Sequence, residues 1–194
     1  MSVPHIDLTC NKCGEGSSPG QLNRHRVYLD GDVEIPVYST LAWCENCAAL
    51  RPVEHFNDAV WTQEEIDEID TKLMQLSDTW FKRFSIRLFN SNSGHREWLG
   101  ERRTALTHRL ALIEKRRGDE ACLVCGSRRL QPFTGDYSLE LDDTFAYVGS
   151  KPTGFIHPGC GGEFIATGSG IRFHFARITY CYSLDGTLIA ERRS

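Results

Sequence analysis

Pairs of cysteine or histidine residues separated by two residues occur four times along this chain. The pairs are Cys10/Cys13, Cys44/Cys47, Cys122/Cys125 and His157/Cys160. A two-residue spacer lets one tight turn direct both side chains at the same ion, and zinc takes four tetrahedral sulfur or nitrogen ligands. The sequence therefore predicts two zinc sites, each built from two turns.

The spacing between the turns favours pairing those that are neighbours along the chain. Thirty residues separate Cys13 from Cys44, and 31 separate Cys125 from His157. We therefore expect an N-terminal site of four cysteines and a C-terminal site of three cysteines and one histidine. Iron would also suit the all-cysteine shell, because both metals accept tetrahedral thiolates. Zinc is the expected ion.

Cys181 is the one cysteine without a partner at this spacing. It lies in the strand-like stretch ARITYCYSL, which favours a small buried side chain. The alternative is that Cys181 replaces His157 as the fourth ligand of the C-terminal site. We favour His157, since it shares a tight turn with Cys160. His174, in IRFHFA, is assigned to a strand rather than to a metal site.

Cysteine usage favours metal binding over a disulfide framework. The N-terminus has no basic start followed by an apolar run, so a secretory signal is not predicted and a cytoplasmic location is expected. The cytosol keeps thiols reduced, which leaves metal binding as the leading explanation for eight cysteines. No apolar run approaches the roughly 20 residues of a membrane-spanning helix, so no membrane partner is expected.

At these turns the chain resembles the zinc-ribbon and treble-clef families. CNKCGEG and CLVCGSRR look like zinc knuckles, in which glycine after the second cysteine lets the backbone turn sharply. HPGCGGEF is similar to a further knuckle, as in a zinc ribbon. In CENCAALRPVEHF, Ala-Ala-Leu after Cys47 looks like the start of a short helix, as in a treble clef. The resemblance covers residues 8–56 and 120–165 and implies metal and fold type, but no particular function.

Strand and turn signals surround the ligand pairs. Asp30-Gly31 lies between two β-branched and aromatic runs and predicts a hairpin. A turn at Pro152/Gly154 is expected to deliver His157. Beyond Cys160 we expect a three-strand meander that turns at Gly168-Ser169-Gly170 and at Asp185-Gly186.

Residues 62–117 contain no cysteine and no proline, and they predict two antiparallel helices. Thr62 with Glu65 forms a capping box, and SNSG at 91–94 separates the helices. Apolar residues recur at three- and four-residue spacing and predict the core of this hairpin. They are Ile66, Ile69, Leu73, Leu76, Trp80 and Phe84, followed by Trp98, Leu99, Leu106, Leu110 and Ile113.

These signals predict an α+β protein in which two small zinc-binding β-rich modules flank an α-helical hairpin, with a C-terminal antiparallel β-meander. The expected segments are a four-cysteine module at 1–58, the helical hairpin at 59–118, and a zinc ribbon with the meander at 119–194. A chain of 194 residues has room for modules of these sizes.

Charge is distributed unevenly. Residues 1–81 carry a net charge of −9, residues 82–117 carry +7 and the rest carry −2, which gives −4 for the chain. A basic helix beside zinc modules favours a nucleic-acid site, because such side chains neutralise phosphates. Alternatively, this helix faces the acidic EEIDEID stretch of the same hairpin and cancels it. The nucleic-acid candidates are Arg102, Arg103, Arg109, Lys115, Arg116 and Arg117.

Enzyme motifs receive less support. No P-loop, dinucleotide fingerprint or H-E-x-x-H occurs. HRE at 95–97 matches the first half of the zinc-deaminase signature, but no C-x-x-C follows a proline. The spacing is also similar to HNH nucleases, with His25 and His55 as candidate histidines. Arg24 stands where that family usually has an acidic residue or histidine, and the usual asparagine before the second cysteine pair is missing.

The leading hypothesis is therefore an adaptor that binds another protein and contains two structural Zn²⁺ ions, without catalytic residues. Both predicted shells are closed by four protein ligands, whereas a catalytic zinc keeps an open position. A nucleic-acid-binding zinc protein that uses the basic second helix is the second hypothesis, and an HNH-like nuclease is the third.

Overall fold

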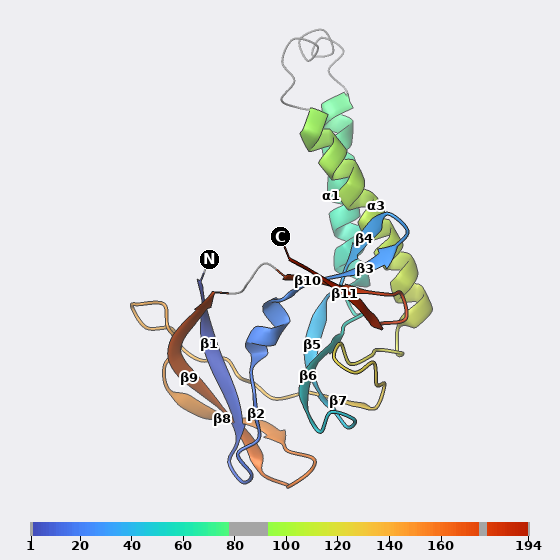
Figure 1. Cartoon of the computed structure of the whole chain (residues 1–194). Coiled ribbons are helices and arrows are strands. Elements are labelled where there is room, and N and C mark those ends of the chain that lie inside the picture. Colours follow the sequence, from blue (N-terminus) through green and yellow to red (C-terminus); the bar gives the residue numbers. More distant parts are fainter. Residues whose placement is uncertain (1, 78–92, 175–177, 194) are drawn as a thin grey trace.

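The computed structural model describes residues 2–77, 93–174 and 178–193. These residues form two α-helices, a short 3-10 helix and strands arranged in three sheets, so the predicted α+β class is confirmed. The helices project as a hairpin from a body made of the sheets (Figure 1). In the described ranges, no helix has the length and apolar character needed to cross a membrane.

The element bounds follow the chain. They are β1 Ser2–Cys10, β2 Gly16–Ser17, η1 Pro19–Asn23, β3 His25–Asp30, β4 Val33–Pro36, β5 Ser39–Cys44, β6 Ala49–Glu54, α1 Ala59–Ser77, α3 Ser93–Arg116, β7 Leu130–Pro132, β8 Ser150–Ile156, β9 Glu163–His174, β10 Ile178–Tyr182 and β11 Leu188–Arg193.

Strands from the two ends of the chain pair with each other. One sheet has the order β2-β1-β9-β8, a second β11-β10-β3-β4 and a third β6-β5-β7. The long pairing of β1 with β9 is antiparallel and ends at Cys10 opposite Phe164, whereas β3 and β10 are parallel. Every sheet thus combines strands from residues 1–58 with strands from residues 119–194, and the two predicted β-rich segments are interleaved.

Two of the predicted turns are present, and two are not. Gly31, with φ +58°, lies in the tight turn between β3 and β4, and Gly186 lies between β10 and β11. By contrast, β8 contains Pro152, and β9 continues through residues 168–170. A Cβ at Gly168 would collide with the backbone carbonyl of Tyr147. This glycine therefore permits a close approach of backbone segments in place of the predicted turn.

The segment after Cys47 is a strand, so the helix predicted there is wrong. In β6, Ala49 lies opposite Cys44 and Leu50 lies opposite Trp43, which continues the ladder of β5. Pro52 has no N–H to donate within a helix, but it is tolerated in this position of the sheet. The sheet pairing therefore outweighs the helix propensity of Ala-Ala-Leu.

The helical hairpin is confirmed, with a start one turn earlier than predicted. The backbone N–H of Thr62 donates to the Asp58 carbonyl at 2.8 Å, so α1 begins at Ala59 and Asp58 caps it. Ile66, Leu99 and Leu106 pack in the interior of the hairpin. Trp98 is 56% exposed and does not belong to this core. The predicted core positions Trp80 and Phe84 lie outside the described residues.

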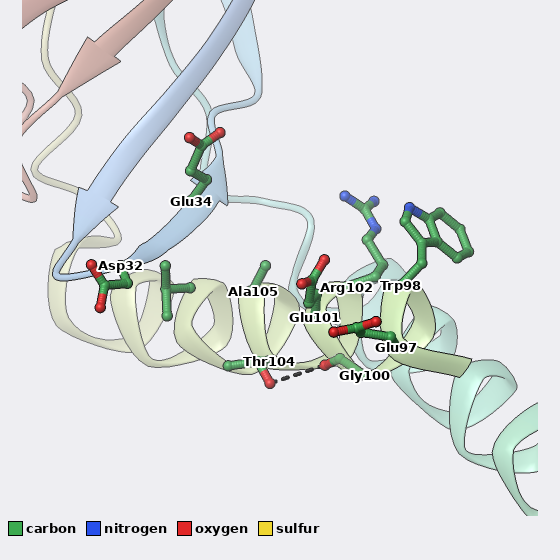
Figure 2. A pocket seen from close by; sticks show the side chains of 10 residues that line it. Asp32, Glu34, Glu97, Trp98, Gly100, Glu101, Arg102, Thr104 and Ala105 are labelled. Atoms are coloured by element: carbon green, nitrogen blue, oxygen red, sulfur yellow. Dashed lines mark hydrogen bonds between the residues drawn. The ribbon is translucent and has the colours of Figure 1, made fainter. Parts of the chain in front are cut away.

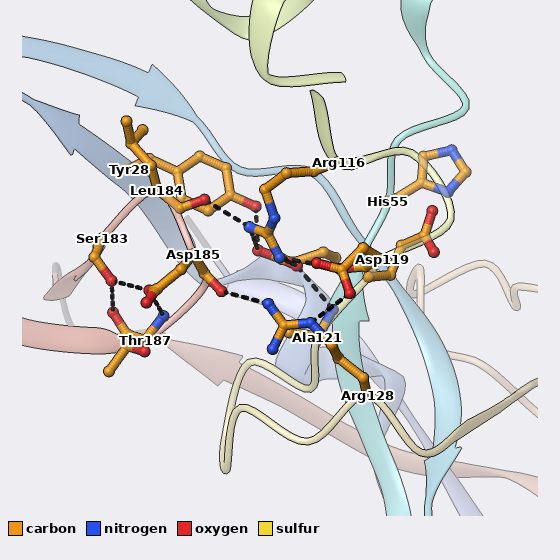
Figure 3. Close-up of polar contacts among 12 residues, drawn as sticks. Tyr28, His55, Arg116, Asp119, Ala121, Arg128, Ser183, Leu184, Asp185 and Thr187 are labelled. Atoms are coloured by element: carbon orange, nitrogen blue, oxygen red, sulfur yellow. Dashed lines mark hydrogen bonds and ion pairs between the residues drawn. The ribbon is translucent and has the colours of Figure 1, made fainter. Parts of the chain in front are cut away.

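A buried ion pair fastens the base of the hairpin to the sheets (Figure 3). The Glu54 side chain, at the end of β6, accepts two hydrogen bonds from the Arg116 guanidinium at 2.7 and 2.6 Å. It also accepts from the Tyr28 hydroxyl at 2.7 Å and from the Ala121 N–H at 2.8 Å. Because Glu54 is fully enclosed, this network joins α3, β3, β6 and the segment that follows α3.

Candidate metal centre

Three of the four ligand turns share one pattern of backbone hydrogen bonds. The first ligand residue donates its N–H to the carbonyl five residues later, and its own carbonyl accepts from the N–H four residues later. The first bond is 2.8 Å for Cys10, 2.9 Å for Cys122 and 2.7 Å for His157. The residue four positions on is glycine each time, and it has a positive φ of 69–75° at Gly14, Gly126 and Gly161. Glycine adopts this left-handed conformation without steric cost.

The remaining turn also has a left-handed residue at the fourth position, but this residue is not glycine. Ala48 occupies the fourth position after Cys44 and has φ 47°. Cys44 and Ala49, five residues apart, are paired at the ends of β5 and β6. The Cys44 turn differs in one bond, because the Ala48 N–H donates to the Glu45 carbonyl at 3.3 Å and not to the carbonyl of Cys44. We call each of the four ligand turns a knuckle.

The second knuckle meets the third and the first meets the fourth, so the predicted pairing of the first with the second and of the third with the fourth is wrong. Ligand atoms of four cysteines lie within 4.8 Å of one another, and so do those of a group of three. We call these the four-cysteine cluster and the three-cysteine cluster. The first contains Cys44, Cys47, Cys122 and Cys125, and the second contains Cys10, Cys13 and Cys160.

The four-cysteine cluster forms because the segment after α3 runs antiparallel to β6. The Leu123 N–H donates to the Pro52 carbonyl at 3.0 Å, and the Glu54 N–H donates to the Ala121 carbonyl at 3.0 Å. This pairing, with a bridge between Val53 and Cys122, sets the third knuckle against the second. Contacts distant in sequence thus override the similar loop lengths that suggested the other pairing.

The three-cysteine cluster lies where β1 ends beside the beginning of β9. The Asn11 N–H donates to the Glu163 carbonyl at 3.0 Å, and Lys12 Nζ donates to the Cys160 carbonyl at 2.6 Å. A Cβ on Gly162 would lie 2.6 Å from Cys10 Sγ. The last glycine of the GCGG stretch is therefore required for the close approach of the first and fourth knuckles, a role that the sequence did not reveal.

The four-cysteine cluster fits a tetrahedral metal ion. Zn–S bonds of about 2.3 Å place sulfurs about 3.8 Å apart in a tetrahedron. Cys44 Sγ and Cys125 Sγ are 3.5 Å apart, and all eight cysteines are free of disulfides. Cys44 and Cys122 are fully buried, whereas Cys125 is exposed. The donor set and its spacing suit zinc.

Ionisation is uneven within this cluster. Burial raises the pKa of the Cys122 thiol, and burial with the neighbouring Cys125 and Cys44 thiols raises the pKa of Cys47 to about 11. Burial also acts to raise the pKa of Cys125, but hydrogen bonds from the Ser127 backbone and from neighbouring side chains outweigh it and lower the pKa to about 7. A divalent cation would allow all four thiols to ionise, because it compensates the repulsion between thiolates.

His157 precedes Cys160 in the fourth knuckle, but neither ring nitrogen lies within 4.8 Å of all three sulfurs of the three-cysteine cluster. Its Nδ1 accepts the backbone N–H groups of Gly159 at 3.0 Å and Cys160 at 3.1 Å. Its ring is 6% exposed and packs edge-on against Trp43, with centroids 4.5 Å apart. Cys10 Sγ and Cys160 Sγ are 3.5 Å apart.

The nitrogen of His157 occupies the position that sulfur occupies in two other knuckles. The Cys10 thiol interacts with the backbone N–H groups two and three residues later, and so does the Cys122 thiol. Gly159 and Cys160 stand two and three residues after His157. The Nδ1 atom therefore replaces the first sulfur of the motif.

The other candidate ligands lie elsewhere. Cys181, in β10, is fully buried and accepts a hydrogen bond from Arg192 Nε at 3.1 Å, and it belongs to neither cluster. His25 Nδ1 contacts the Thr179 hydroxyl, and His55 follows the end of β6. Neither histidine joins a potential metal-binding group of the described residues. His174 ends β9, as its assignment to a strand predicts.

Most of the basic candidates for nucleic-acid binding form ion pairs with carboxylates of the same chain. Arg102 pairs with Glu65, and Arg103 with Asp70, across the two helices. Buried Arg109 pairs with Asp58, and buried Arg116 pairs with Glu54. For Lys115 and Arg117, the described part of the chain contains no ion-pair partner. The basic helix therefore largely cancels acidic groups of its own chain, which was the alternative interpretation of its charge.

Comparison with protein-family models, with curated proteins and with solved structures finds no match to this chain.

Proposed function

We propose that this protein is an adaptor whose scaffold is held together by two structural zinc ions and that it binds another protein. The observation that carries the proposal is the convergence of two knuckles distant in sequence on one four-cysteine cluster. Four free thiols from separate segments gather in this way when a cation holds them, since thiolates repel each other.

The second zinc would be held by Cys10, Cys13, Cys160 and His157. Support comes from the backbone of the His157 turn, which matches the turns of Cys10 and Cys122. A rotation of the imidazole ring would bring Nδ1 from its backbone donors towards the three sulfurs. Trp43 and Phe164 pack against this ring and would keep its motion small.

A structural role suits both sites better than a catalytic one. Four protein ligands leave no coordination position for water or substrate. Both sites join segments that lie far apart in the sequence, so the ions would supply stability that a larger apolar core supplies in other proteins. Iron is the alternative metal for the four-cysteine cluster, because its tetrahedral thiolates suit both metals.

Elemental analysis of purified protein tests the proposal. The expected result is two zinc ions per chain. Removal by a strong chelator should unfold the β-sheet body, observed as loss of the near-ultraviolet circular dichroism signal, and added Zn²⁺ should restore it. One zinc or none per correctly folded chain would contradict the two-site scaffold. Iron in place of zinc would change the metal but not the architecture.

A further inference from the structure

Two neighbouring hollows on the helical hairpin are lined by carboxylates and exposed tryptophan. The larger, of about 670 Å³, lies between α3 and the β3–β4 hairpin. The smaller, of about 330 Å³, lies between α1 and α3. Trp98 and Arg102 line both hollows, which makes them parts of one surface. We call this surface the hairpin groove. Figure 2 shows its larger part, with Glu101, Arg102 and Trp98 extending from α3 on the side of Glu34.

Acidic groups outnumber basic groups in the hairpin groove. Its carboxylates are Asp32, Glu34, Glu64, Glu65, Glu68, Glu97 and Glu101. Three of them are neutralised: Glu65 by Arg102, Glu68 by Lys72 and Glu34 by Arg192. The other four have no ion-pair partner among the described residues. The groove therefore presents uncompensated negative charge.

Two tryptophans give the hairpin groove an apolar component. Trp61 is 50% exposed and Trp98 is 56% exposed, and both line the smaller hollow. Tyr38 packs edge-on against Trp61, with centroids 5.4 Å apart, and His95 stacks on Trp98 at 5.9 Å. Half-exposed tryptophans are typical anchors of protein interfaces. Their ring faces also attract cations.

We propose that the hairpin groove binds a lysine- or arginine-bearing segment of a partner protein. This inference names the partner class of the adaptor proposed above and rests on it. Carboxylates spread along a groove complement the charges of an extended basic peptide, and the tryptophans bind its aliphatic stems and cationic groups. Phosphate groups of a nucleic acid or an anionic membrane would be repelled.

A simple divalent cation does not explain this surface. Within the described ranges, the groups of three or more side chains close enough to hold a metal ion are the two cysteine clusters, and the groove carboxylates form no such group. Arg102, the cation shared by the two hollows, is held by Glu65 at 2.9 and 3.2 Å and therefore leaves the other carboxylates available. The carboxylates are spread along the groove, which suits a peptide with several cationic side chains better than a single metal ion.

Binding of a fluorescent synthetic peptide in which lysine alternates with alanine tests the inference. Fluorescence anisotropy with full-length, zinc-loaded protein should show binding that weakens as salt increases. Trp98→Ala should weaken binding about fivefold. Glu97→Gln combined with Glu101→Gln should weaken it by a similar factor. Matched controls are Leu188→Ala, an exposed apolar residue on β11, and Glu140→Gln, an exposed carboxylate outside the groove. Both should bind like the parent.

Several outcomes would overturn the assignment. They are absence of binding at low salt, equal binding of a glutamate–alanine peptide, preference for a DNA duplex, or equal losses in the control variants. Zinc content measured on the same samples separates the two proposals. Two zinc ions without peptide binding would refute the groove alone, whereas peptide binding by a folded chain without zinc would refute the scaffold alone.

Discussion

The two cysteine clusters are built from similar turns but lie at different junctions of the fold. The four-cysteine cluster lies where β5, β6 and the segment after α3 meet, next to the buried pair of Glu54 and Arg116. The three-cysteine cluster lies at one end of the β1–β9 pairing, with Cys13 exposed. A metal ion in the first cluster would therefore fasten the helical hairpin to the sheets, while one in the second would hold two strands that are already paired.

This difference implies unequal consequences when a ligand is lost. Without the four-cysteine site, the junction between the hairpin and the body would lose the proposed metal crosslink and keep the buried ion pair. Without the other site, β1 and β9 still share a long antiparallel ladder. The first loss should affect the whole fold, and the second should remain local.

The largest effect is expected for Cys122→Ser. Structural zinc contributes about 10–16 kcal/mol of apparent binding free energy, more than a typical domain has in net stability. We expect loss of cooperative thermal unfolding, measured by circular dichroism, with zinc reduced by at least one ion per chain. Cys181→Ser is the matched control, because Cys181 is equally buried but outside both clusters. It should keep both ions. A folded Cys122→Ser protein with two zinc ions would refute the ligand assignment.

The next largest effect should come from Glu54→Gln, which tests the ion pair beside the four-cysteine cluster. The substitution keeps the shape of the side chain but leaves buried Arg116 without its counter-charge. Breaking a buried pair in this way costs about 3–5 kcal/mol. Urea unfolding should show this loss. The exposed pair of Glu45 and Arg129 provides the control, since Glu45→Gln should cost less than about 1 kcal/mol. Equal effects would mean that Glu54 does not brace the junction.

A smaller effect is expected at the other cluster, from His157→Ala. Zinc content should fall from two ions to one, and the near-ultraviolet signal of Trp43, which contacts the ring, should change. Cooperative unfolding should persist, because the four-cysteine site remains. His157→Cys should retain both ions, since it restores the sulfur present in the other knuckles. Two ions in His157→Ala would show that the histidine is not a ligand.

The smallest of these effects should come from Gly162→Ala. The added methyl group would meet Cys10 Sγ and Lys12 Cβ, each 2.6 Å from the new Cβ. Competition with a chromophoric chelator should show about tenfold weaker zinc binding at one of the two sites only. Gly100→Ala offers a control without steric conflict, because open space surrounds that position in α3. It should leave zinc affinity unchanged and raise helix stability by about 0.5–1 kcal/mol. Unchanged zinc affinity in Gly162→Ala would remove the proposed reason for this glycine.

Local signals in the sequence identified several of the building blocks correctly. Asp30-Gly31 predicts its hairpin because two-residue turns require a positive φ, which Gly31 adopts. The acidic and basic helices were expected to face each other as one interpretation of their charge, and Arg102 with Glu65 shows the arrangement. The cysteine spacing identified every member of the two clusters, because a knuckle is defined by a few adjacent residues.

Local signals could not predict which distant segments of the chain pair with each other. The gaps after Cys13 and Cys125 are nearly equal in length and do not determine which knuckles meet. Which knuckles meet is determined by the pairing of β1 with β9 and of Val53 with Cys122. These are contacts between residues far apart in the chain. Ala48 likewise adopts a left-handed conformation that its residue type does not predict, and this turns Ala-Leu into a strand.

Zinc stoichiometry in two double variants tests most directly whether the first knuckle pairs with the fourth and the second with the third. Cys13→Ser with Cys160→Ser changes two members of one cluster, so elemental analysis should find one zinc ion per chain. Cys13→Ser with Cys47→Ser changes one member of each cluster, so both sites should be lost. If the first knuckle paired with the second and the third with the fourth, the results would be reversed. One ion in the Cys13/Cys47 variant and none in the Cys13/Cys160 variant would contradict the account.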